Sequence, residues 1–369
     1  MADESFLKQQ LITYMGNKRK LIYAISQVVQ GVEQALGSTS LTFGDGFSGS
    51  GVVSRLFKSR GTTLYTNDLA GYSETLARCF LATPSDRTRA RVRTLIASAN
   101  SFADDPEGAQ VTRWVAEHWA PSGKIRRDHR VFFTEENGNR IDRYRAFIER
   151  LPAADRPFLL APLLVESSIH NNTSGQFSAF YKCNGVGAYG GKKSIDIKRI
   201  TKAICLPLPT FDPNPCVVTA SRLDANEWAK TIPPLDLVYY DPPYNQHPYS
   251  IYYFMLDIIN DWDTSAEIPD TTRGQPKTWK RSPYNSFVDA ENAFIDLIDA
   301  TKAKFILLSY NSRGIIPLEK LERILRRKGK LTKIPVEHRT YNKMTGIAAY
   351  KRKVKKDAIQ EFLWLVDCR

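Results

Sequence analysis

Near the start of the chain, short apolar runs alternate with segments whose apolar residues are spaced as in a helix. The apolar run at 41–45 leads into a glycine-rich segment at 46–51, and residues with helical spacing follow at 52–59. A second apolar run at 63–68 ends in an acid. This order of strand, turn, helix and strand predicts a βαβ unit, with which parallel sheets covered by helices on both faces are built.

The same alternation resumes near residue 216. The patterns predict strands at 216–221, 235–241 and 303–310, and helices at 249–262 and 317–329. Two further apolar patterns, at 330–341 and 361–366, predict an antiparallel hairpin at the end of the chain. The expected fold class is therefore α/β, with a doubly wound, mostly parallel sheet and a terminal antiparallel hairpin.

Residues 81–212 do not continue this alternation. Within them, the stretch 170–194 is rich in Asn, Gly, Ser, Tyr and Lys, a composition typical of adaptable surface loops rather than of a core. We therefore expect 81–212 to be an inserted lobe, while 1–80 and 213–369 together form the α/β domain.

Composition excludes several classes of protein. The 369 residues are 42% hydrophobic and contain no biased tract, which excludes low-complexity disorder. No apolar run approaches the ~20 residues that a membrane span needs, and the first residues lack the pattern of an export signal. The five Cys and five His residues are scattered, so neither a disulfide framework nor a metal site is predicted. We expect a protein of the reducing cytoplasm, without a metal and without a membrane partner.

Positive charge is concentrated in two segments. The chain carries a net charge of +13, and between residues 321 and 356 thirteen Lys or Arg residues stand against two acids. A smaller basic cluster contains Lys182, Lys192, Lys193, Lys198, Arg199 and Lys202. Such clusters indicate a polyanionic partner such as nucleic acid, although a solvated basic face is the plainer alternative.

The glycine-rich segment FGDGFSGSG (43–51) is the first motif that indicates chemistry. Glycines at a strand-to-helix turn allow the backbone to approach a ligand closely, and Asp68, at the end of the next strand, is placed to bind ribose hydroxyls. The motif indicates a nucleoside-containing cofactor but does not choose between NAD and S-adenosylmethionine. A glycine turn without a ligand is the alternative.

The second motif, DPPYN (241–245), follows an apolar strand and is more specific. Two consecutive prolines make the backbone rigid, so the side chain of Asp241 and the carbonyl of Pro242 can together accept both hydrogens of an exocyclic amine. Tyr244 offers an aromatic face on which a base can stack. An ordinary strand-ending turn is the alternative.

These motifs resemble those of the alpha group of S-adenosylmethionine-dependent adenine-N6 DNA methyltransferases, in which a target-recognition region lies between the cofactor motifs and D-P-P-Y. The resemblance implies a Rossmann-like methyltransferase domain, with 81–212 as the inserted DNA-recognition lobe. It implies cofactor contacts at Tyr14, Lys18, Asp45, Phe47, Gly49, Gly51, Asp68, Asp224 and Asp241. It implies a catalytic motif made of Asp241, Pro242, Pro243 and Tyr244.

Double-stranded DNA is the expected partner. The segment 171–180 resembles part of the family's recognition region, and together with the basic clusters it gives candidate DNA contacts. They are Asn171, Asn172, Ser174, Lys182, Lys192, Lys193, Lys351, Arg352 and Lys353. The resemblance implies a bacterial cytoplasmic enzyme, either a stand-alone methylase or the partner of a separately encoded restriction endonuclease.

The chemistry of the motif agrees with direct methyl transfer to an amine. Because the lone pair of the adenine N6 is delocalised into the ring, two acceptors at Asp241 and Pro242 can turn it toward the methyl donor, so positioning supplies most of the rate. The target base must first be flipped out of the duplex. Cytosine-N4 methylation, an NAD-dependent oxidoreductase and a catalytically silent DNA-binding protein are the alternatives.

Overall fold

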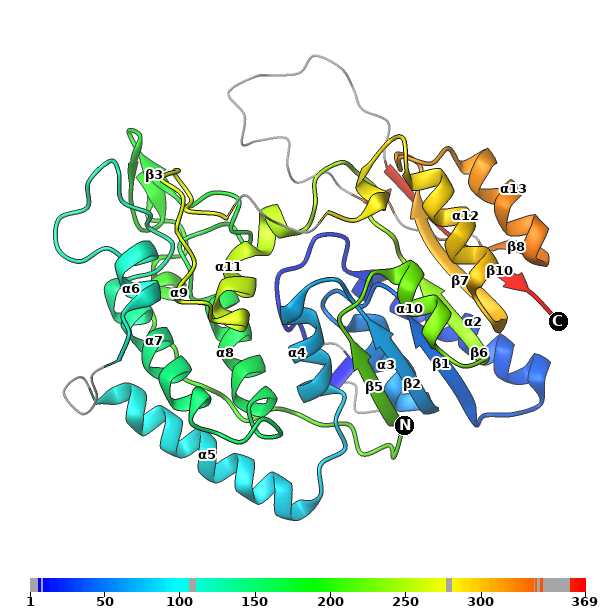
Figure 1. Cartoon of the computed structure of the whole chain (residues 1–369), viewed down its shortest axis with the longest axis horizontal. Helices are drawn as coiled ribbons and strands as arrows, with labels where there is room; N and C mark the ends of the chain where they lie inside the picture. Colours follow the sequence, from blue (N-terminus) through cyan, green and yellow to red (C-terminus); the bar gives the residue numbers. More distant parts are fainter. Residues whose placement is uncertain are drawn as a thin grey trace.

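A single mixed sheet organises the α/β part of the molecule in the computed structural model (Figure 1). The structure describes residues 6–7, 9–105, 111–276, 281–334, 336, 339–340 and 359–369. The strands are β1 (Leu41–Asp45), β2 (Gly61–Asn67), β5 (Val217–Ser221), β6 (Leu235–Tyr240), β7 (Ala303–Asn311), β8 (Lys330–Ile334), β9 (Arg339–Thr340) and β10 (Ile359–Asp367). Their order in the sheet is β5-β2-β1-β6-β7-β10-β8, and β9 pairs with β10.

The five strands from β5 to β7 are parallel, as the sequence predicts. The last strand, β10, is antiparallel to its neighbours and lies between β7 and β8, so the terminal strands form the antiparallel part of the sheet. This is a doubly wound, Rossmann-like arrangement, in which ligands bind at the carboxyl ends of the parallel strands.

Successive side chains of β6 point to opposite faces of the sheet. Leu237 and Tyr239 belong to the core beneath α2 (Ile22–Leu36) and α3 (Val52–Arg60). Val238 and Tyr240 belong to the core on the opposite face. That second face is covered by α10 (Ala225–Thr231), α12 (Ala290–Ala300) and α13 (Leu318–Lys328). Each large apolar side chain buried in this way stabilises the sheet by about 1.5–3 kcal/mol.

Helices make up most of the region between β2 and β5. They are α4 (Gly71–Phe80), α5 (Asp86–Asp104), α6 (Trp114–Trp119), α7 (Glu135–Glu149), α8 (Pro157–Ile169) and α9 (Ile197–Thr201), with a short β3–β4 hairpin (Lys182–Cys183 and Val186–Gly187) and the 3-10 turn η2 (Gly191–Lys193). In the described part of the chain, no helix has the length and apolar character needed to cross a membrane.

The core of this helical region extends beyond 81–212. It includes side chains of α4, such as Tyr72, and of α11 (Ser250–Asp261), such as Phe254. Helix α4 contacts both β5 and α8, and α11 contacts α4 and α8 (Figure 1). The helical region is therefore packed onto the α/β part through elements that precede and follow it in the sequence.

Candidate active site

The carboxyl ends of the parallel strands border a cavity of about 430 Å³. Residues that follow β1, β2, β5 and β6 line it, as do residues of α11 and the segment after it. The predicted residues among them are Tyr14, Phe47, Asp68, Asp224, Asp241 and Pro243. The structure thus brings most of the predicted cofactor residues to one cavity together with part of the catalytic motif.

The glycine-rich turn packs tightly against Tyr14. Gly49 has a φ of 51°, and a Cβ atom at this position would lie 2.7 Å from Cε1 of the Tyr14 ring. The ring is itself stacked on Tyr249 and Tyr253, at centroid distances of 5.1 and 4.9 Å. Gly51, with a φ of 77°, precedes the first residue of α3. A side chain on Gly49 would therefore disturb the cavity wall.

Asp45 lies behind the turn rather than in the cavity wall. Its carboxylate is fully buried, and Oδ2 accepts a 2.6 Å hydrogen bond from the Ser54 hydroxyl while Oδ1 has no partner. Burial raises the pKa of Asp45 to about 7. In this structure Asp45 therefore supports the turn through Ser54 and does not line the cavity.

Two other predicted acids face the cavity and organise backbone there. Asp68 accepts hydrogen bonds from the amides of Gly49 (2.7 Å) and Ala70 (2.9 Å), and burial raises its pKa even though these donors oppose the shift. Asp224 caps α10 by accepting from the amide of Asn226 at 2.9 Å. Both carboxylates are thus fixed in orientation at the cavity wall.

The D-P-P-Y motif directly follows β6 and is hydrogen-bonded to two other segments. The amide of Ile315 donates to the carbonyl of Tyr244 at 3.1 Å, and the side-chain amide of Asn285 donates to the carbonyl of Asn245 at 2.7 Å. The Tyr244 ring packs edge-on against Tyr310 at 5.0 Å. Tyr310 and Ile315, at and after the end of β7, thus hold the D-P-P-Y loop in place.

Lys18 lies against the Asp241 carboxylate. Its Nζ is 3.0 Å from Asp241 Oδ2 and donates to the Tyr244 hydroxyl at 2.7 Å and to the Gly16 carbonyl at 3.0 Å. The Tyr244 hydroxyl in turn donates to Asp241 Oδ1. Burial raises the pKa of Asp241 while Lys18 opposes the shift, and the pKa of Lys18 is raised because its acidic neighbours outweigh its burial. Lys18 therefore contacts the catalytic motif directly and is not part of the cavity lining.

The predicted DNA contacts divide into buried and exposed residues. Asn171 and Asn172 are fully buried. The amide of Asn171 donates to the carbonyls of Ser167 and Ser168, and that of Asn172 to the carbonyls of Val131 and Ala188. These two amides hold the loop together and are not available to a base edge in this structure. The candidates at the surface are Ser174, Lys182, Lys192 and Lys193.

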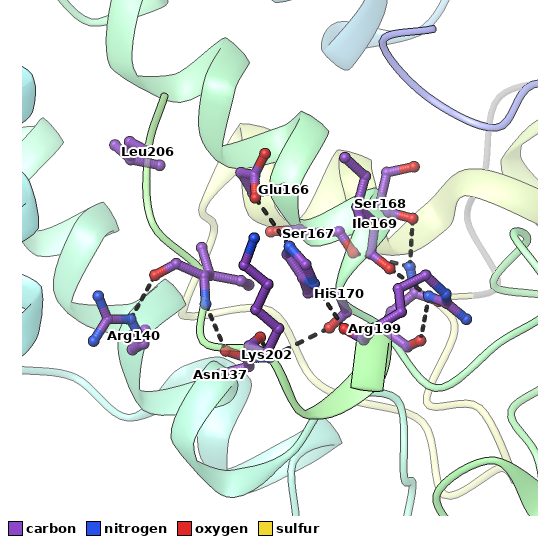
Figure 2. A network of polar contacts seen from close by, with 12 residues as sticks. Asn137, Arg140, Glu166, Ser167, Ser168, Ile169, His170, Arg199, Lys202 and Leu206 are labelled. Atoms are coloured by element: carbon purple, nitrogen blue, oxygen red, sulfur yellow. Dashed lines mark hydrogen bonds and ion pairs between the residues drawn. The ribbon is translucent and has the colours of Figure 1, made fainter. Parts of the chain in front are cut away.

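A polar network explains why this Asn-rich segment is ordered (Figure 2). The Arg199 guanidinium donates to the carbonyls of Ile169, Asn171 and Thr173, and its own carbonyl lies 2.7 Å from Nδ1 of His170. Arg199 thus binds backbone within the lobe instead of forming part of an outward basic surface. The expectation that residues 170–194 form only adaptable loops is wrong for 171–173, which are buried.

The larger basic segment is only partly within the described residues. Lys351, Arg352 and Lys353 lie outside them. On α13, Arg327 lies 3.6 Å from Asp299, and on β8 Lys333 lies 3.2 Å from Glu322. Some of the positive charge near the end of the chain is therefore neutralised within the protein.

Five charged residues of the site are not predicted from the sequence: Arg222, Asp257, Asp261, Asp263 and Glu361. Arg222 and Asp257 line the cavity, and burial raises the pKa of Asp257 to about 7. Glu361, on β10, lies 3.8 Å from Lys18 Nζ. Arg222 could have been predicted, because it directly follows β5 and lies two residues before Asp224. The sequences of α11 and β10 contain no local pattern that indicates a site. No group of three His, Cys, Asp or Glu side chains suited to a metal occurs in the ranges that the structure describes.

Comparisons with known proteins agree with this geometry. A family model described as D12 class N6 adenine-specific DNA methyltransferase matches residues 14–324. The type II methyltransferase M.NlaIII of Neisseria lactamica is 28% identical over 339 residues, covering 89% of this chain and 92% of that protein. M.CviAII of Paramecium bursaria Chlorella virus 1 is 27% identical over 335 residues, with the same coverage of 89% and 92%. M.FokI of Planomicrobium okeanokoites is 26% identical over 365 residues, which cover 96% of this chain but 52% of that protein.

The matched span contains both motifs and the helical region between them. It thus confirms the resemblance predicted from the sequence, and it favours neither cytosine-N4 methylation nor the oxidoreductase. The chain belongs to the D12 class of N6 adenine-specific DNA methyltransferases.

Proposed function

We propose that this enzyme uses S-adenosylmethionine to methylate N6 of an adenine flipped out of double-stranded DNA, with Asp241 and Pro242 holding the amine. The observation that carries the proposal is the meeting of the D-P-P-Y motif and the glycine-rich turn at one cavity of about 430 Å³. Cavities of this size hold cofactors and other small ligands.

The charge of the cavity wall supports S-adenosylmethionine over NAD. S-adenosylmethionine supplies a methyl group bound to a positively charged sulfur. Among the described lining residues, Arg222 is the one basic side chain, whereas six are aspartates: Asp68, Asp224, Asp241, Asp257, Asp261 and Asp263. Lys18 pairs with Asp241 and Arg222 with Asp261, and the remaining aspartates of the wall suit a cation and oppose the pyrophosphate of NAD.

The aromatic and acidic side chains of the cavity suit the other parts of this cofactor. Phe47 lies edge-on to Tyr284 at 5.3 Å and presents an apolar surface for an adenine ring. Asp68 is the acid proposed to bind the ribose hydroxyls, and Asp224 the acid near the adenine. Tyr14, held by its ring stack, borders the same cavity.

For catalysis, the chain supplies acceptors and orientation. The Asp241 carboxylate and the Pro242 carbonyl accept the two amine hydrogens, which directs the N6 lone pair toward the methyl group. Tyr244 is proposed to stack on the flipped base, which offsets part of the cost of about a few kcal/mol for unstacking it. To do so, the Tyr244 ring must turn away from its present contact with Asp241.

We assign DNA recognition to the lobe at 81–212 and catalysis to 1–80 and 213–369. The exposed Ser174, Lys182, Lys192 and Lys193 support a DNA-facing surface on the lobe, with the lysines setting register through phosphates. The basic segment 321–356 is proposed to bind phosphates without reading sequence. The curated relatives are named type II methyltransferases, from which we propose a separately encoded restriction endonuclease as partner and a bacterial cytoplasmic location.

Labelled methyl transfer tests the reaction. Purified protein is incubated with methyl-labelled S-adenosylmethionine and unmethylated bacterial DNA, and the DNA is then digested to nucleosides. We expect label in N6-methyl-2′-deoxyadenosine and none in N4-methyl-2′-deoxycytidine, whose labelling would overturn the assignment of the base. Asp241→Ala should abolish transfer while DNA binding is retained, and equal transfer by the variant would refute the role of Asp241.

Long-read sequencing of DNA from cells with and without the gene tests site specificity. We expect methylated adenines in one short sequence motif only in the cells that carry the gene. Methylation without a motif would contradict site-specific recognition by the lobe.

A further inference from the structure

Glu361 reaches the catalytic motif from near the end of the chain. It lies on β10, where it pairs with Asn311 at the end of β7, and its side chain is 11% exposed. Because β10 runs antiparallel to β7, the start of β10 lies at the edge of the sheet where the parallel strands end. The Glu361 Oε1 atom is 3.8 Å from Nζ of Lys18.

The protons of Lys18 already have other acceptors. An ammonium has three donors, and the acceptors within 3.0 Å of Nζ are the Gly16 carbonyl, the Tyr244 hydroxyl and Asp241 Oδ2. At 3.8 Å, Glu361 contributes charge attraction and no close hydrogen bond. Lys18 thus lies between two acids, bound to Asp241 and near Glu361.

This arrangement leaves no free oxygen on the catalytic carboxylate. Oδ1 of Asp241 accepts from Tyr244, and Oδ2 is in contact with Lys18. Each carboxylate oxygen can accept a second hydrogen bond, so the adenine amine must either share an oxygen of Asp241 with one of these partners or displace that partner. A lysine that leaves its acid inside the protein needs another anion, because an unpaired buried charge is strongly unfavourable.

We propose that Glu361 is a positioning residue that takes up the Lys18 ammonium when the target amine binds to Asp241. The inference rests on the proposed role of Asp241. When Tyr244 turns outward to stack on the base, Lys18 loses one acceptor and its free proton is directed to Glu361. Glu361 then keeps Lys18 charged and paired while Asp241 accepts from the amine.

A double-mutant cycle of Glu361→Gln and Lys18→Gln tests this inference by single-turnover methyl transfer to DNA. Glu361→Gln keeps the size of the side chain and removes its charge. We expect it to slow transfer about tenfold, and to add no further change in the Lys18→Gln background, because it acts through Lys18. Calorimetry should give a Kd for S-adenosylmethionine within about twofold of the wild-type value, since Glu361 does not line the cavity.

Asp367→Asn is the matched control. Asp367 lies on the same strand and pairs with Arg369 at 2.7 Å, and its replacement removes the same charge. We expect wild-type transfer from this variant. If Glu361→Gln does not fold, Glu361→Asp takes its place in the cycle, with a smaller loss of rate expected.

Two outcomes would overturn the inference while the proposed function stands. One is a wild-type rate for the Glu361 variant, and the other is an equal loss of rate with and without Lys18. Absence of methyl transfer by the unmodified protein would instead overturn the proposed function, and this inference with it.

Discussion

Gly49 and Gly51 both have left-handed backbone conformations, but only Gly49 lies against another side chain. Replacing either glycine by alanine places a Cβ on a backbone with positive φ, at a cost of about 1–2 kcal/mol. At Gly51 nothing lies within 4 Å of the new atom. At Gly49 the new atom lies 2.7 Å from the Tyr14 ring, which cannot move freely because it is stacked on Tyr249. Overpacking of this kind adds about 1–3 kcal/mol.

Gly49→Ala should therefore lower the free energy of unfolding by about 2–5 kcal/mol, and Gly51→Ala by about 1–2 kcal/mol. Urea denaturation measures both values. Because displacing Tyr14 alters the cavity wall, we also expect Gly49→Ala to weaken S-adenosylmethionine binding at least about tenfold by calorimetry, which corresponds to about 1.4 kcal/mol. Gly51→Ala, whose new Cβ meets no side chain, should lose less affinity than Gly49→Ala. Equal losses of affinity in the two variants would refute the collision with Tyr14 as the cause.

Three further predictions address stability and DNA binding. Burial raises the pKa of Asp45 to about 7, so the protonated carboxyl stabilises the fold at low pH, and this contribution is lost as pH rises from about 4 to about 7. Asp45→Asn should therefore flatten the fall in the free energy of unfolding over this pH range, as measured by urea denaturation. An unchanged dependence on pH would contradict the prediction. Asn172→Ala leaves the buried Val131 carbonyl and Gly190 amide without their partner and should cost about 3 kcal/mol of stability, with little change in the DNA affinity of the folded protein. Lost affinity without lost stability would indicate a direct DNA contact. Neutralising Lys351, Arg352 and Lys353 together should weaken binding to all DNA similarly and flatten its salt dependence, and a changed recognition motif would refute the phosphate role.

Local patterns were sufficient for the strands and turns that carry the motifs. The alternation of apolar runs and helical spacing predicts β1, β2, β6 and β7 to within a few residues, because burial on a sheet imposes its period on neighbouring residues. The position of each motif after a strand then places the motifs at one edge of the sheet. For this reason the D-P-P-Y loop and the glycine-rich turn are predictable as neighbours.

The burial of polar residues in the lobe was not predictable in the same way. Asn172 reads as a loop residue in the sequence, but its amide is bound to carbonyls that are 41 and 16 residues away along the chain. Likewise, Arg199 looks like part of a basic cluster until its three carbonyl partners are known. A polar side chain is buried only where partners compensate its lost hydration, and those partners come from distant segments.

The fold class, the glycine-rich turn and the D-P-P-Y motif are predictable from the sequence, because each depends on residues that are close together along the chain. Which charges meet at Asp241 depends instead on the tertiary structure. Lys18 and Glu361 are separated by most of the chain, and they approach because β10 pairs antiparallel with β7. Strand pairing across such a distance leaves no local period in the sequence. The approach of Glu361 to Lys18 therefore becomes evident only in the folded molecule.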